Sequence, residues 1–502
     1  MGLTGESLAA EPASAVTSLL AARAVANRIV RASAVYGSAN FGIRALNFLL
    51  LPIYTRYLTP SDYGMIALAE TLAMFLMQVV NLGFDASIQR LYFQHVDDSS
   101  ELSGYIGSAL KFALGTEVGF LLLALTAGPW LQRMIWPHAA VPFRYIALAM
   151  VTAAATQFFT YRLVLYQAER RPRIYAVLSF LSFGLTASLS VSLVAAAHRG
   201  VMGMLGGKCL AAMICLSIAV FLASPSFRSP FHWHHVRETA SLGLPLVPHQ
   251  LMAGGLIAAD RFILLHYRDL REVGLYSIAY TFGMVMALIT TSLNQAWAPV
   301  YYDIARKGEE GRQLLSKMCS GIIIVLVTIA CFGALCAQDF IARFLDAKYA
   351  AAGRVVPWII GAYLAHSLFS MFSLAALQAR RTKVIMGASF VALVLNTILN
   401  FALIPRWGMY GAAYATLLAY VAEALVMYSL AQRICRLHYD LPRAFAAMGV
   451  LAAVLVITQI RWSAPIRPVV MGGALVVSVG LLLALGFGRS TRYLRLIVRM
   501  PD

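Results

Sequence analysis

Two long apolar segments near the start of the chain carry polar residues at helical spacing. The first runs from about residue 32 to 57, and its polar face consists of Gly37, Asn40, Arg44 and Asn47. The second runs from about residue 63 to 89, and its polar residues are Glu70, Gln78, Asn81 and Asp85. Residues three or four apart share one face of a helix. Because such side chains are costly in lipid, we expect both polar faces to line one watery cavity.

Apolar segments of similar length recur along the whole chain. A helix needs roughly 20 apolar residues to cross a bilayer, and we predict about fourteen such helices. Their centres lie near residues 45, 76, 117, 153, 186, 212, 251, 287, 326, 366, 393, 420, 451 and 477. The connections between them are short, which leaves no room for a separate soluble domain. The expected fold is therefore an all-α polytopic membrane protein.

Composition supports this interpretation. Of the 502 residues, 60% are hydrophobic and only 12% are charged, and the mean hydropathy is +0.74. These values exclude a soluble globular protein. The net charge of +18 does not indicate a nucleic-acid partner, because the basic residues are spread through the connections between helices. Their excess in alternate connections predicts that both termini are cytoplasmic.

A duplication relates two halves of the chain. A shift of 210 residues superimposes the motif at residues 57–64 on residues 267–274, and a similar shift relates 200–203 to 408–411. The pattern predicts two pseudo-symmetric six-helix bundles, followed by two C-terminal helices. We expect a cytoplasmic lead-in at residues 1–31, the N-terminal bundle at 32–224, a cytoplasmic linker at 225–239, the C-terminal bundle at 240–434, and helices 13 and 14 with a basic tail at 435–502.

Polar faces recur in the second half. In the helix centred near residue 251, Pro245 and Pro248 predict a bend. Gln250, Gly254 and Arg261 then follow on nearly one face. From all of these polar faces we predict the following substrate-cavity residues: Asn40, Arg44, Asn47, Gln78, Asn81, Gln250, Arg261, Tyr280 and Asn294.

Acidic residues within the predicted helices are candidates for ion coupling. They are Glu70, Asp85, Glu117 and Glu423. They would bind a proton or cation, or they would neutralise buried arginines, and no motif decides between these roles. Arg44 lies near the middle of its helix, where an arginine costs at least ~2.5 kcal/mol on insertion. We therefore expect Arg44 to face the cavity.

No metal or cofactor site is expected. His232, His234 and His235 lie in the linker, but no further ligand is evident beside them. No pair among the six cysteines has CxxC spacing, and we interpret the cysteines as packing residues.

Three motifs resemble those of a known family. Residues 47–64 (NFLLLPIYTRYLTPSDYG) resemble the first-helix signature of the Wzx-type polysaccharide biosynthesis flippases, which belong to the multidrug/oligosaccharidyl-lipid/polysaccharide exporter superfamily. Residues 259–264 (ADRFIL) with 273–276 (VGLY) resemble the turn between its helices 7 and 8, and residues 408–413 (GMYGAA) resemble the start of its helix 12. The resemblance implies two bundles around a central cavity, with two further helices.

The resemblance also implies a function, which is transport and not enzymatic catalysis. We expect a flippase that moves a lipid-linked oligosaccharide from the cytoplasmic to the outer leaflet of a bacterial inner membrane, for exopolysaccharide, capsule or O-antigen synthesis. Alternating access through a cationic cavity would carry the substrate, with Arg44 and Arg261 attracting its phosphates. Expected partners are the lipid-linked substrate, membrane lipids, a polysaccharide polymerase and a co-polymerase.

Three other functions are alternatives to the flippase. A drug/cation antiporter and a lipid II flippase belong to the same superfamily. A membrane glycan polymerase or ligase is disfavoured, because such enzymes generally need a sizeable extramembrane loop or paired carboxylates.

Overall fold

Helices account for all regular secondary structure in the part of the chain that the structure describes. This computed structural model describes residues 37–38, 41–43, 45–95, 97–135, 141–306, 308–436, 440–460, 462–463 and 466–497. Residues 45–57 are helical. They are followed by α2 (Pro60–Asn81), α3 (Phe84–Tyr92), α4 (Ser99–Ile135), α5 (Phe143–Ala168), α6 (Pro172–Val191), η1 (Ser192–Ala196), α7 (Gly200–Phe227) and α8 (Trp233–Gly243). The second half comprises η2 (Leu244–Leu246), α9 (Val247–Tyr267), α10 (Leu270–Ala305), α11 (Gly308–Phe344), η3 (Ala347–Arg354), α12 (Val356–Gln378), α13 (Thr382–Trp407), α14 (Met409–Ile434), α15 (Leu441–Gln459) and α16 (Arg467–Ile497).

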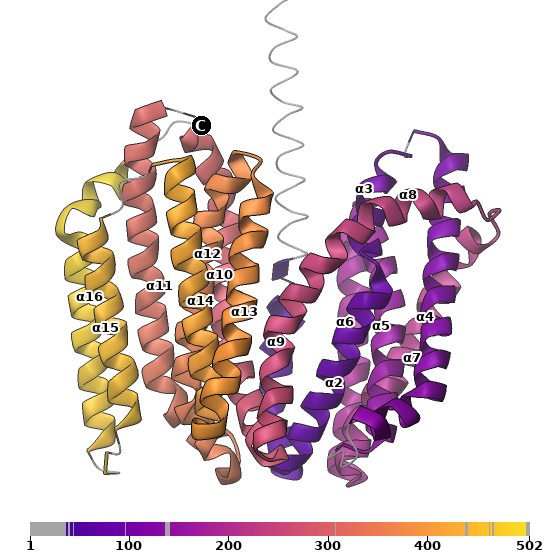
Figure 1. Ribbon diagram of the computed structural model, residues 1–502, viewed down its shortest axis with the longest axis horizontal. Coiled ribbons are helices and arrows are strands. Elements are labelled where there is room, and N and C mark those ends of the chain that lie inside the picture. Colours follow the sequence, from indigo (N-terminus) through magenta and orange to yellow (C-terminus); the bar gives the residue numbers. More distant parts are fainter. Residues whose placement is uncertain are drawn as a thin grey trace, which may run out of the picture.

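The helices form two groups (Figure 1). We call α2 to α8 the N lobe, in which α5 packs against α2, α4 and α7. We call α9 to α14 the C lobe, in which α14 packs against α12 and α13. The last two helices, α15 and α16, pack against α11 on the outside of the C lobe. The expected all-α polytopic class is confirmed.

Twelve helices of the described chain are long and apolar enough to cross a membrane. They include every predicted span except those centred near residues 45 and 251. The first of these lies partly outside the described residues. The second is the 21-residue helix α9, whose polar residues, including Gln250, Asp260 and Arg261, lower its hydropathy. The predicted total of about fourteen is therefore not confirmed.

The helices α2 and α10 begin with matching caps. The Thr59 hydroxyl accepts a hydrogen bond from the Asp62 amide at 3.2 Å, and the Asp62 carboxylate accepts one from the Thr59 amide at 2.9 Å. Before α10, the Asp269 carboxylate accepts a bond from the Glu272 amide at 2.8 Å. These bonds satisfy amides that a helix leaves free at its N-terminus. The duplicated motif thus encodes two equivalent helix starts.

The duplicated glycines lie where α2 crosses α10. A Cβ atom on Gly64 would collide with the Leu270 carbonyl oxygen, and one on Gly274 would collide with the Pro60 carbonyl oxygen. Only glycine lets the two backbones approach this closely. The crossing is the main junction between the N lobe and the C lobe.

Further contacts join the lobes, the first of them at the same end. The Tyr349 hydroxyl, on η3, donates a hydrogen bond to the Leu58 carbonyl at 2.9 Å. Farther from this end, Phe48, on the helix before α2, packs against Phe282 of α10 with ring centroids 4.7 Å apart. Figure 1 shows the lobes meeting at this end, drawn at the bottom, and diverging toward the end that holds α3 and α8.

The second predicted helix is interrupted. We expected one helix over about 63–89, whereas α2 ends at residue 81 and α3 begins at residue 84. Leu82 and Gly83 have positive φ angles of 50° and 70°. A Cβ atom on Gly83 would collide with the backbone of Gly243, where α8 ends. This close approach turns the chain and places Asp85 on α3.

Candidate functional site

A cavity of about 500 Å³ lies where the N lobe faces α9. Its walls are α2 and α5, with one residue each from α3, α7 and α9. Its polar lining residues are Glu70, Gln78, Asn81, Asp85, Thr152, Thr156, Gln157 and Gln250. Its apolar lining residues are Ala73, Met74, Met77, Ala149, Ala153 and Leu205. A polar chamber among membrane-spanning helices is a candidate site for a polar ligand.

Helical spacing explains which side chains reach the cavity. On α2, the lining positions are 70, 73, 74, 77, 78 and 81. On α5, they are 149, 152, 153, 156 and 157. Each set occupies one face of its helix. Because α2 and α5 pack side by side, the two faces form adjoining walls.

Two glutamine side chains in the lining have an amide oxygen that accepts no hydrogen bond. Within the described residues, the buried Oε1 atoms of Gln78 and Gln250 have no hydrogen-bond partner. Gly254 leaves room for Gln78, because a Cβ atom at position 254 would collide with Gln78 Oε1. A buried acceptor without a donor costs about 1–3 kcal/mol. Both side chains line the cavity although these oxygens are buried, so a ligand hydroxyl would gain by donating a hydrogen bond to either oxygen once the side chain turns toward the cavity.

Other lining residues already have partners. The Tyr161 hydroxyl donates to Asn81 Oδ1 at 2.8 Å. Lys208 of α7 donates to Glu70 Oε1 at 2.5 Å, and both side chains are partly exposed. The charged residues of the described lining are the acidic Glu70 and Asp85. The lining is thus polar, and within the described residues its own charged groups are not the cationic ones expected from the sequence.

Arg261 and Tyr280 lie together in the C lobe and do not line this cavity. Arg261 is 8% exposed, its Nη1 lies 3.6 Å from Oδ1 of the fully buried Asp260, and its guanidinium lies over the Tyr280 ring, 4.7 Å from the centroid. The Tyr276 hydroxyl donates to the other oxygen of Asp260. Arg261 therefore belongs to a buried charged cluster of α9 and α10. Its phosphate-binding role stays a prediction.

Glu423 belongs to a second buried cluster. It is 2% exposed on α14, and its Oε2 lies 3.0 Å from Nδ1 of His366 on α12. The Ser389 hydroxyl of α13 donates to the other carboxylate oxygen at 2.8 Å. Its role in ion coupling stays a prediction.

Of the remaining predicted residues, those that the structure describes lie apart from the cavity. Glu117 is buried in α4, and its Oε1 has no hydrogen-bond partner among the described residues. Asn47 is exposed and Asn294 is half-buried, and neither lines the cavity. Asn40 and Arg44 lie outside the described residues.

The cavity unites five predicted residues with several that sequence reasoning missed. The five are Glu70, Gln78, Asn81, Asp85 and Gln250. The missed residues are Thr152, Thr156 and Gln157 in the lining and Lys208 beside it. The spacing of the two threonines, four positions apart and next to a glutamine, was a usable signal. It is weak, because threonine hydroxyls in helices often bond to their own backbone, as Thr152 does to the Leu148 carbonyl at 2.7 Å.

Sequence comparisons place the chain among proteins of polysaccharide biosynthesis. Residues 29–305, more than half of the chain, match the family described as polysaccharide biosynthesis protein. A protein of the Lsg locus of Haemophilus influenzae is 23% identical over 302 residues, which are 58% of this chain and 70% of the relative. The succinoglycan biosynthesis transport protein ExoT of Rhizobium meliloti is 22% identical over 293 residues, which are 58% of this chain and 57% of the relative.

Solved structures with the same fold are transporters. The lipid II flippase MurJ, in an inward closed conformation, has a TM-score of 0.67 at 12% identity and covers 92% of this chain and 99% of its own. An inward-facing multidrug resistance MATE family transporter of the MOP superfamily has a TM-score of 0.61 at 14% identity, over 81% of this chain and 96% of its own. At these identities the likeness establishes the fold.

Proposed function

Because the chain belongs to the polysaccharide biosynthesis protein family, we propose that it is a flippase that moves a lipid-linked oligosaccharide from the cytoplasmic to the outer leaflet of a bacterial inner membrane. The chain is a multi-pass membrane protein with a fold found in MATE transporters and MurJ. The relative from Rhizobium meliloti is named for succinoglycan transport. We extend that kind of cargo, a glycan, to this chain.

The polar cavity between the N lobe and α9 carries the proposal. An oligosaccharide head group presents many hydroxyls, and each would cost several kcal/mol to bury in hydrocarbon without a hydrogen bond. Gln78 and Gln250 line the cavity, and their buried, unpartnered oxygens would accept from such hydroxyls after the side chains turn toward it. A volume of about 500 Å³ lies within the usual range for a small-molecule site. We infer that it holds part of the sugar head while the lipid tail stays in the bilayer.

Alternating access would use the junction between the lobes. The crossing of α2 with α10 and the bond from Tyr349 to Leu58 close one end. By our proposed orientation, with basic connections and both termini in the cytoplasm, this closed end is external. Rocking about the crossing would then expose the cavity to each side in turn.

The phosphate and ion-coupling roles are part of the same proposal. Arg44 and Arg261 would attract the phosphates, the latter by exchanging Asp260 for substrate. Glu70, Asp85, Glu117 or Glu423 would carry a coupled H⁺ or Na⁺. A polysaccharide polymerase and co-polymerase would receive the product on the outer side.

Substitution of the two unpartnered amides tests the proposal. Gln78→Leu combined with Gln250→Leu should lower surface polysaccharide about 30-fold, because each substitution removes a hydrogen bond worth ~1 kcal/mol and the two losses add to about 2 kcal/mol. The measurement is surface glycan in cells whose own flippase gene has been replaced by the variant. Ser217→Ala, on an exposed position of α7, is the matched control and should have no effect. Normal surface glycan from the double variant, at normal protein level in the membrane, would reject the role of the cavity.

A drug/cation antiporter is the second candidate. The observation in its favour is that the charged residues of the described lining, Glu70 and Asp85, are acidic and suit a cation. Against it, Lys208 already pairs with Glu70, and the chain belongs to the polysaccharide family. Expression of the gene in a drug-sensitive strain separates the two functions. Drug resistance without any glycan defect in the deletion strain would favour the antiporter.

Two other functions give different phenotypes. A lipid II flippase would be essential for growth, whereas a flippase for surface glycan would be dispensable when the first glycosyltransferase is also deleted. A polymerase or ligase would leave single repeat units already exposed in the outer leaflet of a deletion strain.

A further inference from the structure

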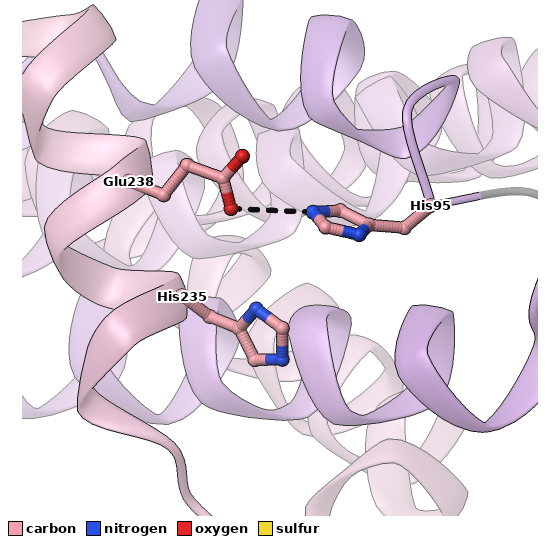
Figure 2. Close-up of side chains that lie close together, drawn as sticks. All are labelled: His95, His235 and Glu238. Carbon is pink, nitrogen blue, oxygen red and sulfur yellow. Dashed lines mark hydrogen bonds and ion pairs between the residues drawn. The ribbon is translucent and has the colours of Figure 1, made fainter.

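A cluster of side chains outside the cavity has the composition of a metal site. His95 follows α3, and His235 and Glu238 lie on α8. One ligand atom from each of these three residues lies within 4.8 Å of the other two. Figure 2 shows the three side chains converging between the α8 ribbon and the segment that carries His95. We call these three residues the histidine cluster.

His95 is held by a carboxylate at each ring nitrogen. Its Nε2 lies 3.2 Å from Oε2 of Glu238, and its Nδ1 lies 3.2 Å from Oε1 of Glu101. Its ring also stacks on Tyr105, with centroids 5.1 Å apart. A histidine that binds a metal through one nitrogen usually donates its other N–H to a carboxylate. Glu101 is placed to accept that bond.

His235 brings an imidazole nitrogen without a partner. Its side chain is 2% exposed, and within the described residues its Nδ1 has no hydrogen-bond partner. A buried imidazole nitrogen of this kind needs a hydrogen-bond partner or a metal ion.

We propose that His95, His235 and Glu238 bind a divalent transition metal, with Zn²⁺ as the best match, and that Glu101 orients His95. Two imidazoles and one carboxylate are a ligand set that zinc uses, with water in the fourth position. Ligands ~2.0–2.2 Å from a tetrahedral zinc lie about 3.3–3.6 Å from one another. The His95–Glu238 separation of 3.2 Å is close to this spacing, and rotation of His235 would complete it.

The alternative is a protonated His95 that bridges two carboxylates. That arrangement explains His95, Glu101 and Glu238 without a metal. It leaves Nδ1 of the buried His235 without a partner, whereas a metal ion would satisfy it.

The position of the cluster suggests what the metal would do. Residues 143 positions apart in the sequence meet here, since His95 lies beside α3 and Glu238 lies on α8. The helix α8 leads through η2 into α9, the first helix of the C lobe. A metal would fasten α8, the last helix of the N lobe, to the end of α3, near the end where the lobes diverge. The proposal is independent of the transported substrate.

The sequence did not predict this site. We expected no metal because the linker histidines had no evident further ligand. Of those histidines only His235 belongs to the cluster, while the His232 and His234 rings lie 5.8 Å and 3.8 Å from its ring. The missing ligands were Glu238, three positions after His235, and His95, which only the fold brings near.

Zinc binding by the purified full-length protein tests the proposal. The protein is kept in detergent, its affinity tag is removed, and it is treated with chelator before calorimetric titration with ZnCl₂. We expect about one Zn²⁺ per chain. His95→Gln, His235→Gln and Glu238→Gln should each abolish binding or weaken it more than ~10-fold, and Glu101→Gln should weaken it ~10–100-fold as an orienting residue.

The controls separate this site from adventitious binding and from misfolding. His198→Gln removes an exposed histidine elsewhere and should leave zinc binding unchanged. Glu238 and Glu101 are partly exposed, at 37% and 51%, so their glutamine variants should fold, as size-exclusion chromatography can verify. No zinc binding by the wild-type protein would overturn the proposal. Equal affinity in the wild type and in Glu238→Gln and His95→Gln would also overturn it.

Discussion

Polar side chains inside this membrane protein belong to two chemical groups. Some are paired, as Arg261 is with Asp260 and Glu423 is with His366 and Ser389. Others leave an acceptor without a donor, as Gln78 and Gln250 do in the cavity. Paired groups are satisfied by the fold itself, whereas unpaired acceptors gain from a ligand. This difference selects Gln78 and Gln250 as the residues we expect to contact the substrate's hydroxyls, whereas its phosphates would have to displace Asp260 from Arg261.

Loss of one member of the buried pair should be costly. Asp260→Asn should lower the free energy of unfolding by about 3–5 kcal/mol, because buried Arg261 would lose its carboxylate. Asp260→Asn with Arg261→Gln should recover most of that loss. Thermal unfolding of each purified variant in detergent measures the change in stability relative to the wild type.

The exposed ion pair of Arg312 with Glu309 supplies the control. Its side chains are 49% and 64% exposed, so Glu309→Gln should change stability by less than about 1 kcal/mol. An Asp260→Asn variant as stable as the wild type would contradict the structural role of the buried pair.

At the scale of helices, the duplicated segments build the contact between the lobes. The sequence motif repeated at residues 57–64 and 267–274 caps α2 and α10 and supplies Gly64 and Gly274. These glycines lie at one crossing, each against the backbone of the other helix. The repeated motif therefore supplies both helix starts and the joint between the lobes.

Alanine at either glycine should weaken this joint. Gly64→Ala or Gly274→Ala places a Cβ against a backbone carbonyl that cannot rotate away, and should destabilise the protein by about 1–3 kcal/mol. Gly184→Ala, on α6, meets no atom within 4 Å and should be neutral or stabilising. Thermal unfolding and surface-glycan complementation measure the effect. Equal melting temperatures for all three variants would show that the helix crossing is not close-packed.

For the molecule as a whole, the lobes meet at one end and diverge at the other (Figure 1). The closed end holds the α2–α10 crossing and the bond from Tyr349 to Leu58. The cavity lies on the side of α2 that faces α5 and α9, and Asp85, just beyond the turn at the diverging end of α2, lies in its lining. We therefore expect access to the cavity from the end of α3 and α8, which is cytoplasmic in our proposed orientation.

Cysteine labelling tests this access. In a background without the native cysteines, Thr156→Cys should react several-fold faster with a membrane-impermeant maleimide in inside-out vesicles than in intact cells, because position 156 is exposed in the cavity. Leu58→Cys, fully buried at the closed end, should react slowly in both preparations. Faster labelling of Thr156→Cys from the outside would reverse the proposed orientation or the resting state.

Several features followed from local sequence because their causes are local. Helix length and apolarity identified the membrane spans, and helical spacing identified the polar face of α2, including Gln78 and Asn81. Repetition of a short motif identified the matching starts of α2 and α10. The break at Leu82 and Gly83 did not follow, because it depends on the approach of Gly243 from a distant helix.

The sequence by itself determined the all-helical membrane fold, since hydrocarbon requires backbone groups to be paired within helices whatever their neighbours are. It also determined which helices carry polar faces. Only the tertiary structure decided which faces meet: Gln78 with Gln250 around a cavity, Asp260 and Arg261 of α9 with Tyr276 and Tyr280 of α10 in a buried cluster, and His95 with Glu238 beside α3. The reason is that pairing depends on contacts between residues far apart in the chain, and the spacing of residues along one helix contains no information about its partners.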